Sequence, residues 1–335
     1  MYIYFFKDNY HKKTSDIRVD KIAWYNINRL RAAERHFGRL PNLDYRMWAT
    51  ILLVGLAVFA AGEPLGPSPI TLDYHATVGV PEAIRIRNAE EAMDFDGGRV
   101  AGGSTVNLGA HPYLVGLLVQ LTTGQTSVCG ASLVSNTRLV TAAHCWRDRS
   151  NQGRQMTAVL GSVRLFSGGT RLTTSNVNMH QNFNVNNLNN DIAVVVIPRV
   201  NYNNNIRAIN LPSQAMQILN FAGYTAQVIG YGVTNDSEDI TTGQVARRRN
   251  LEVIRNEACA QAYGFNVIAS TLCTSGQGNV GPCGGDSGGP LALNLSGQRV
   301  LIGVVSFHSA MGCRVGFPGG YARVTSFTPW IQSRL

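Results

Sequence analysis

The chain has 335 residues, of which 44% are apolar and 15% are charged, and it carries a formal net charge of +9. This low charge with ample apolar content excludes a disordered chain or a coiled coil, and only six cysteines exclude a dense disulfide mini-scaffold. The sixteen Arg residues after residue 100 are scattered, apart from Arg247-Arg248-Arg249, so we expect no nucleic-acid partner.

An apolar segment of fourteen residues, 48–61, has the length of a signal-peptide core. Small residues at its end suit cleavage before Glu63, so we expect a signal peptide over residues 47–62 and a secreted product. Residues 1–46 are then a doubtful upstream extension. The alternative is a signal anchor with a basic cytoplasmic tail, although fourteen residues span a bilayer poorly.

Residues 63–99 have the composition of a pro-segment that is removed from the mature protein. They begin with a Pro-rich stretch, continue through a polar, helix-compatible run over residues 81–93, and end at Arg99. The segment has no cysteine, so no covalent bond would retain it after a cut at Arg99.

From Val100 onward, short runs rich in β-branched residues alternate with clusters of Gly, Asn and Ser. Residues 113–121, 192–197 and 300–306 are examples. Such a pattern predicts an antiparallel all-β sandwich or barrel. A helical pattern over residues 325–335 closes the chain.

The cysteines have no spacing that is typical of a metal site, so we expect no zinc. An even number behind a signal peptide predicts three disulfides formed in an oxidising compartment, and fifteen connectivities remain open. The six are Cys129, Cys145, Cys259, Cys273, Cys283 and Cys313.

Three short segments carry chemistry: Val140-Thr-Ala-Ala-His144-Cys145, Asn190-Asp191-Ile-Ala-Val and Cys283-Gly-Gly-Asp286-Ser287-Gly-Gly-Pro290. A serine flanked by glycines can sit in a tight turn, with its hydroxyl exposed and backbone N–H groups directed at a substrate oxygen. The hydroxyl needs a base of near-neutral pKa, which His144 supplies. The imidazole needs an acceptor behind it, which Asp191 supplies.

Each segment alone also has a purely structural explanation. His144 fits a core histidine, Asp191 fits the cap of a strand edge, and the Gly-rich turn fits a plain loop. The three together, in the order His, Asp, Ser, predict nucleophilic catalysis by Ser287.

These segments resemble the trypsin/chymotrypsin family of serine endopeptidases. The likeness covers nearly all of residues 100–335, from Arg99-Val-Ala-Gly-Gly103 to Ala322-Arg-Val and Trp330-Ile. It implies a trypsin-like all-β peptidase domain of two packed six-stranded antiparallel β-barrels with a short C-terminal helix. Barrel one would occupy about residues 100–215 and barrel two about residues 216–335.

The resemblance also implies the role of each catalytic residue. Ser287 would be the nucleophile, His144 the general base and then acid, and Asp191 the group that orients His144. The N–H groups of Gly285 and Ser287 would form the oxyanion hole, and no cofactor or metal is implied. The implied disulfides are Cys129–Cys145, Cys259–Cys273 and Cys283–Cys313.

The resemblance further implies a zymogen. A trypsin-like protease would cut after Arg99, and the new amino group of Val100 would then turn inward and pair with Asp286. Pairing raises the pKa of an amino group, so this contact would be complete below about pH 8 and lost at higher pH. We therefore expect an enzyme that works at alkaline pH, with this pair setting its upper limit.

Specificity depends on the position six residues before Ser287, which is Gly281. A tryptic pocket needs Asp there, so the resemblance implies a pocket for large apolar or aromatic side chains. Gly319 would keep that pocket deep, whereas His308 and Pro282 depart from the family pattern. Residues Ser306, Phe307 and His308 would pair with the substrate backbone as an added β-strand.

Taken together, we expect a secreted chymotrypsin-like digestive endopeptidase, similar to digestive chymotrypsins of moth and butterfly larvae, that acts in the gut lumen. Its partners would be protein and peptide substrates, an activating trypsin-like protease and protein protease inhibitors, and it would be a monomer. The alternatives are a membrane-anchored processing protease and a catalytically silent homologue that serves as a binding module.

Overall fold

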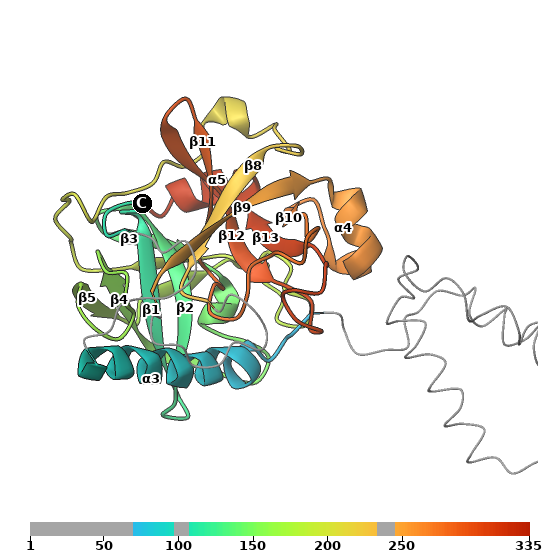
Figure 1. Cartoon of the computed structure of the whole chain (residues 1–335). Coiled ribbons are helices and arrows are strands. Elements are labelled where there is room, and N and C mark those ends of the chain that lie inside the picture. The colour runs from blue at the N-terminus through green and yellow to red at the C-terminus, as the bar shows by residue number, and fades with distance from the viewer. Residues whose placement is uncertain (1–69, 97–106, 233–244) are drawn as a thin grey trace, which may run out of the picture. The chain divides into compact units, whose positions relative to one another are not determined.

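The computed structural model describes residues 70–96, 107–232 and 245–335 (Figure 1). The expected upstream extension, signal peptide, cleavage residue Arg99 and new terminus Val100 lie outside these described residues. Within the described part of the chain, no helix is long and apolar enough to cross a membrane.

Strands between residues 114 and 196, which we call the first half of the β-structure, form a seven-stranded antiparallel sheet in the order β5-β4-β1-β2-β3-β7-β6. Its interior strand β1 carries the sequence LVGLLVQL and is buried along nearly its whole length, as expected for apolar side chains packed on both faces. The strands are β1 (Leu114–Leu121), β2 (Thr126–Ser135), β3 (Arg138–Thr141), β4 (Gly153–Leu160), β5 (Thr170–Thr174), β6 (Val177–Met179) and β7 (Ala193–Val196).

The difference between seven strands and the expected six comes from one chain segment. Only Ser175 and Asn176 separate β5 from β6, yet these two strands lie at opposite edges of the sheet. The segment therefore carries the chain from one edge to the other, and the sheet must curl for this short connection to reach. The break at Ser175-Asn176 divides one expected strand into two.

The second half forms a closed six-stranded barrel in the order β10-β13-β12-β11-β8-β9. With the first sheet it confirms the predicted all-β class. The barrel strands are β8 (Thr225–Gly230), β9 (Arg247–Ile254), β10 (Thr271–Thr274), β11 (Pro290–Leu295), β12 (Gln298–Phe307) and β13 (Gly319–Arg323). The helices of this half are α4 (Asn256–Tyr263) and the expected C-terminal helix α5 (Val324–Gln332), and the single-turn helices of the two halves are η2 (Ala143–Cys145), η3 (Gln214–Met216) and η4 (Gly264–Asn266).

Three disulfides join the six cysteines as the resemblance implies. Cys129–Cys145 links β2 to the turn that carries His144, and Cys283–Cys313 links two loops near Ser287. Each bond restricts the unfolded chain, and the loops closed by Cys129–Cys145 and Cys283–Cys313 contain His144 and Ser287.

A helical segment precedes the first sheet. It comprises η1 (His75–Gly79) and the seventeen-residue helix α3 (Val80–Asp96), which packs against β2 and runs below β1 and β2 in Figure 1. The helix covers the helix-compatible run predicted from sequence. Its buried side chains recur about every three residues and include Ala83, Ile86 and Ala89, which is the spacing of one helix face.

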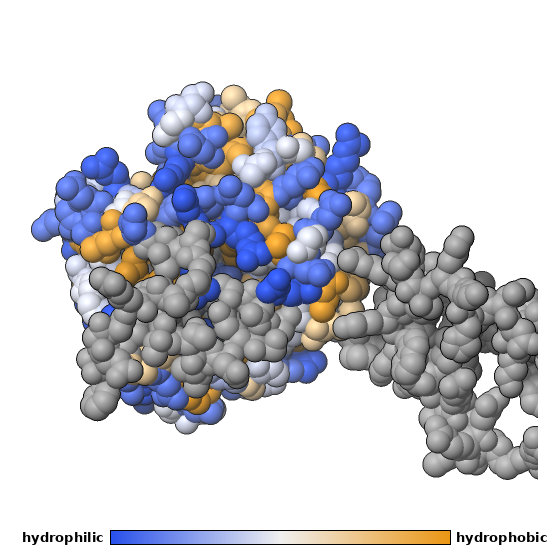
Figure 2. All heavy atoms as spheres, in the orientation of Figure 1, coloured by the Kyte–Doolittle hydropathy of each residue, from blue (hydrophilic) through white to orange (hydrophobic). Residues whose placement is uncertain are grey.

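On the face drawn in Figure 2, the described part of the surface is mainly hydrophilic. In Figure 2 apolar side chains on the described part of this face occur in small groups between hydrophilic ones. Single exposed apolar side chains such as Ile218 and Phe265 are ordinary for a folded protein.

Candidate active site

Strand pairing brings His144 and Asp191 together. His144 lies in η2 just after β3, Asp191 lies just before β7, and these two strands are antiparallel neighbours. The Asp191 carboxylate accepts two hydrogen bonds from His144, one from Nδ1 at 2.7 Å and one from the backbone N–H at 2.8 Å. Both residues are only 1% exposed. A hydrogen bond at Nδ1 leaves Nε2 as the ring atom that can take up a proton.

A third group fixes the carboxylate. The hydroxyl of Ser306, on β12 of the barrel, donates to Asp191 Oδ2 at 2.6 Å. The hydrogen bond joins the two sheets of the protein at the base of the site. Sequence reasoning assigned Ser306 to substrate binding and missed this contact, because it joins positions 115 residues apart.

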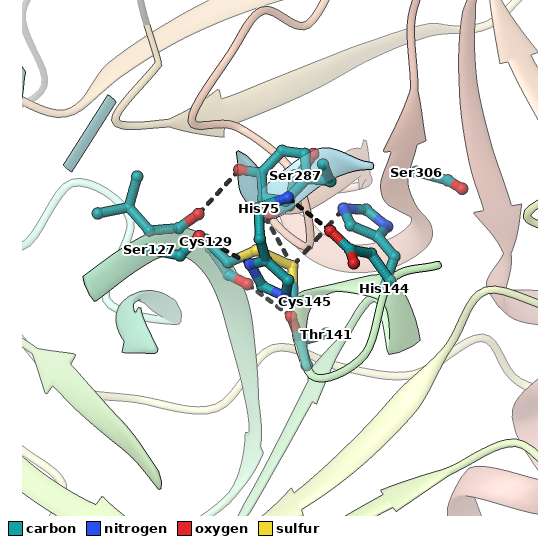
Figure 3. The surroundings of a disulfide bond; sticks show 12 residues. His75, Ser127, Cys129, Thr141, His144, Cys145, Ser287 and Ser306 are labelled. Atoms are coloured by element: carbon teal, nitrogen blue, oxygen red, sulfur yellow. Dashed lines mark hydrogen bonds between the residues drawn. A yellow bond between two sulfur atoms is a disulfide. The ribbon is translucent and has the colours of Figure 1, made fainter. Parts of the chain in front are cut away.

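The turn that carries Ser287 is held against β2 by its backbone. Gly130 N–H donates to the Ser287 carbonyl oxygen at 2.7 Å. Gly288 has φ +79°, and a Cβ there would lie 2.3 Å from Thr141 Oγ1. Only glycine fits so close an approach in this conformation. Figure 3 shows Ser287, His144 and His75 grouped around the Cys129–Cys145 disulfide.

Asp286 is half-buried and makes no salt bridge among the described residues, although the charge of Arg249 acts on it. Its two carboxylate oxygens accept the N–H groups of Gly232 at 2.9 Å and Cys283 at 3.0 Å. Burial raises the pKa of this carboxyl to about 6, although the two N–H groups act in the opposite direction. A desolvated carboxylate of this kind gains stability from an incoming cation.

The predicted pocket positions Gly281 and Gly319 differ in how closely they are packed. A Cβ at Gly281 would lie 3.4 Å from the Cys313 carbonyl oxygen, whereas a Cβ at Gly319 would lie 2.6 Å from Pro282 Cδ. Pro282 thus packs directly on Gly319, so the two positions depend on each other. His308 is half-buried, and its Nδ1 donates to the Ser309 carbonyl oxygen at 2.9 Å.

The ring of Phe307 covers Gly320, the neighbour of Gly319. A Cβ at Gly320 would lie 2.3 Å from that ring, so this position of β13 requires glycine. Phe307 is buried, and its side chain is therefore part of the barrel wall beside the pocket.

Tyr74 occupies the centre of the site, and sequence reasoning did not single it out. Its ring meets the His144 ring edge-on, with 4.7 Å between centroids. Its hydroxyl donates to the Val128 carbonyl oxygen at 2.8 Å, and the Ser287 side chain and the Gly285 N–H lie near enough to the phenol to act on its pKa. Burial raises the pKa of this phenol, so it stays protonated. The sequence signal that could have indicated this role was the pair Tyr74-His75, a tyrosine and a histidine within a polar segment.

The site has no free metal-ligand set within the described ranges. The one group of close potential ligands there is Cys129, His144 and Cys145, and its two sulfur atoms are bonded to each other. What the arrangement offers instead is an oriented imidazole beside a serine turn that is rich in backbone N–H donors.

The comparisons with known proteins agree with this geometry. The family model described as "Trypsin" matches residues 100–331. A collagenase of Hypoderma lineatum is 38% identical over 236 residues, which cover 70% of this chain and 86% of the relative. Brachyurin of Leptuca pugilator is 33% identical over 210 residues, which cover 62% of this chain and 87% of that relative.

A solved structure agrees as well. The HL collagenase structure superposes with a TM-score of 0.64 at 36% identity, covering 70% of this chain and 98% of the other. The matches in fold and in sequence both include the residues that build the site, and they agree on one family. The chain belongs to the trypsin family, and it is a serine endopeptidase.

Proposed function

We propose that the chain is the zymogen of a secreted, chymotrypsin-like digestive endopeptidase, with Ser287 as nucleophile, His144 as general base and Asp191 as the residue that orients it. The observation that carries this proposal is the buried hydrogen-bond chain from Ser306 through Asp191 to His144, which ends beside the Ser287 turn. Proteins and peptides are its substrates.

In the proposed reaction, His144 Nε2 takes the Ser287 hydroxyl proton as the oxygen attacks the substrate carbonyl. Asp191 stabilises the resulting imidazolium, and the N–H groups of Gly285 and Ser287 bind the oxyanion. The imidazolium then gives its proton to the leaving amine, which leaves an acyl-enzyme. Water, deprotonated by His144, attacks this ester, and the proton returns to Ser287.

Activation is proposed to follow a cut after Arg99. Asp286 is half-buried, and desolvation of its carboxyl raises its pKa to about 6, so the ionised form is costly in the uncut chain. The amino group of Val100 would compensate this charge. The domain boundaries stay predictions, with the pro-segment over residues 63–99 and the peptidase domain over residues 100–335, and the proposed activator is a trypsin-like protease.

Gly281 supports cleavage after large apolar or aromatic residues, because an uncharged pocket base offers no partner to Lys or Arg. Pro282 and His308, which depart from the family pattern, belong to this proposed pocket. Collagen belongs among the test substrates, because one relative is named collagenase. Protein protease inhibitors, a monomeric state and the gut lumen as the site of action are parts of the same proposal.

Cleavage mapping tests the proposal. The full chain is cut at Arg99, separated from its pro-segment and incubated with a mixed peptide library and with collagen. We expect Ser287-dependent cuts, chiefly after Phe, Tyr, Leu or Met, that are lost in Ser287→Ala. They should persist in Ser326→Ala, which changes an exposed serine of α5.

Other outcomes would contradict particular parts of the proposal. Cuts after Arg or Glu would contradict the pocket argument, and no cuts at all would favour the silent binding module. An amino terminus of the product upstream of residue 47 would favour the membrane-anchored protease.

A further inference from the structure

We propose, on the basis of the proposed function, that residues 70–92 are an inhibitor of the peptidase domain that stays bound after the Arg99–Val100 bond is cut. In this proposal cleavage alone gives an inhibited complex, and full activity requires that the segment leave. Four sets of contacts between the segment and the peptidase domain support it.

The first contact is at the strand that should receive substrate. Ile70 pairs in an antiparallel bridge with Ser309, one residue beyond the predicted substrate-binding residues Ser306, Phe307 and His308. The Ile70 side chain is buried in a cluster that includes Phe307. Because a peptide substrate is expected to add to this same edge, the segment and a substrate compete for it.

The second contact blocks the reacting groups. The Ser287 side chain and the Gly285 N–H, which is proposed to bind the substrate oxyanion, lie near enough to the Tyr74 phenol to act against the rise in its pKa. The Tyr74 ring packs edge-on against His144, and Ser287 is only 6% exposed. Among the described residues, no hydrogen bond joins Ser287 to His144, whose Nε2 lies 3.9 Å from Cys145 Sγ. Tyr74 therefore excludes both water and substrate.

The segment is also a poor substrate, because it is helical where it meets Ser287. Tyr74 has φ −53° and ψ −47°, and η1 follows directly. An added β-strand must be extended, so no bond after Tyr74 lies along the substrate edge. Gly79 permits this close approach, since a Cβ there would lie 2.0 Å from Ser127 Oγ.

The third set of contacts anchors the segment beside Tyr74. His75 donates its backbone N–H to Asp148 Oδ2 at 2.7 Å, and its Nδ1 lies 2.8 Å from Ser127 Oγ. Asp73 accepts hydrogen bonds from Ser150 Oγ at 2.6 Å and from the Arg149 guanidinium. These contacts hold Asp73 and His75, the residues directly before and after Tyr74 in the chain.

The fourth anchor is Glu90, near the end of the segment. This carboxylate is 2% exposed and accepts the N–H groups of Leu165 at 2.5 Å, Phe166 at 3.0 Å and Ser167 at 3.0 Å. The Ser167 hydroxyl donates to it as well, at 3.1 Å. A buried carboxylate with four donors is a strong, specific contact between the helix and one loop of the first sheet.

All four sets of contacts lie amino-terminal to residue 92, whereas the cut is at Arg99. Cutting after Arg99 therefore removes none of them. The segment has no cysteine, so its retention depends on these contacts alone. The inhibited complex is thus non-covalent, and dilution or further digestion of the segment releases it.

The experiment uses the full chain with residues 95–99 replaced by Asp-Asp-Asp-Asp-Lys, so that enteropeptidase frees Val100. Retention of the cut segment is measured by size-exclusion chromatography, and activity is followed on a small amide substrate before and after dilution. The variants are Tyr74→Ala, the milder Tyr74→Phe, and Glu90→Gln. Glu91→Gln is the matched control, because Glu91 is exposed on the same helix turn.

We expect the cut parent and Glu91→Gln to retain the segment, to show less than a tenth of their final activity, and to gain the rest slowly after dilution. Glu90→Gln and Tyr74→Ala should be active at once and lose the segment. Tyr74→Phe keeps the packed ring, so the segment should stay bound but should inhibit the peptidase at least fivefold less well. This milder variant keeps the test valid if Tyr74→Ala fails to fold.

Two results would overturn the inference: a cut parent that is fully active while the segment is still bound, or Glu90→Gln that behaves like Glu91→Gln. A protein that stays inactive after the segment has been removed would instead contradict the proposed function.

Discussion

Asp191 collects hydrogen bonds from three groups, namely the ring and backbone of His144 and the hydroxyl of Ser306. The short Ser306 contact stabilises the charge of Asp191, and that charge is needed most when His144 becomes positive. We therefore expect Ser306 to act through Asp191 as a positioning residue.

We expect Ser306→Ala to lower kcat about tenfold with KM nearly unchanged, because a hydrogen bond to a buried charge is lost where charge develops. Steady-state kinetics of the mature enzyme measure this. The control is Ser132→Ala, a buried serine whose hydroxyl has no hydrogen-bond partner among the described residues. A rise in KM alone would contradict the positioning role and restore the substrate-binding role predicted from sequence.

His75 is expected to make docking of the proposed inhibitory segment, residues 70–92, depend on pH. Burial lowers its pKa to about 4, with Asp148 raising it and His144 lowering it further. The unbound histidine takes up a proton below about pH 6.5, whereas the docked one does so only near pH 4. Docking is therefore strongest above pH 6.5 and weakens as pH falls through this window.

We expect the affinity of the cut segment to fall by about thirtyfold between pH 8 and pH 5. Dissociation from the Ser287→Ala variant, which cannot digest the segment, measures it at both pH values. The control His75→Asn removes this titration but keeps a polar side chain. If His75→Asn shows the same pH dependence as the parent, His75 is not the responsible group.

The sequence was enough to predict the proposed catalytic residues because their motifs are local. His144, Asp191 and Ser287 each lie in a short, recognisable string, and the structure brings His144 and Asp191 into direct contact. The roles of Tyr74 and Ser306 could not be predicted in this way, since each depends on contacts between distant parts of the chain.

At the scale of elements, the Ser287 turn depends on close packing against β2 and β3. Gly288 has a positive φ, and a Cβ there would lie 2.4 Å from the Gly130 carbonyl oxygen. Gly297 offers a comparison, because it has nearly the same φ of +82° but nothing within 4 Å of a Cβ.

We expect Gly297→Ala to cost about 1 kcal/mol of the free energy of unfolding, which is the strain of positive φ alone. Gly288→Ala should cost about 3 kcal/mol or more, because overlap with Thr141 and Gly130 adds to the same strain. Urea denaturation of the uncut chain measures both. Equal losses would show that the turn is not held by close packing.

The all-β class followed from the sequence, whereas the order of strands did not. β-branched runs between turn residues predict strands, but which strands pair depends on long-range packing. The break at Ser175-Asn176 gave seven strands where six were expected. The helical run was predicted, yet the role of Glu90 on α3 was missed, because its partners lie 75 or more residues away.

At the scale of the whole molecule, Asp286 couples proton uptake to the stability of the uncut chain. Its pKa is raised to about 6 by burial, compared with 3.8 for a free carboxyl. The folded chain therefore keeps a proton that the unfolded chain has lost between about pH 4 and pH 6. The free energy of unfolding falls as pH rises through this window and does not fall further above it.

We expect the difference in unfolding free energy between the uncut parent and uncut Asp286→Asn to change by up to about 3 kcal/mol from pH 4 to pH 7, with the parent losing stability as pH rises. Denaturation at several pH values measures this difference. Effects of the substitution that do not depend on pH are the same at every pH, so they do not contribute to the change. A difference that is independent of pH would contradict the raised pKa.

The most direct test of the account is to locate the nucleophile. The chain is cut, freed of its pro-segment and treated with a sulfonyl fluoride, which modifies serines that are activated by a neighbouring base. Mass spectrometry of the digested product should show one adduct, on Ser287, in parallel with loss of peptide hydrolysis, and neither should occur in His144→Ala. Inactivation without an adduct on Ser287, or undiminished hydrolysis by Ser287→Ala, would contradict the account.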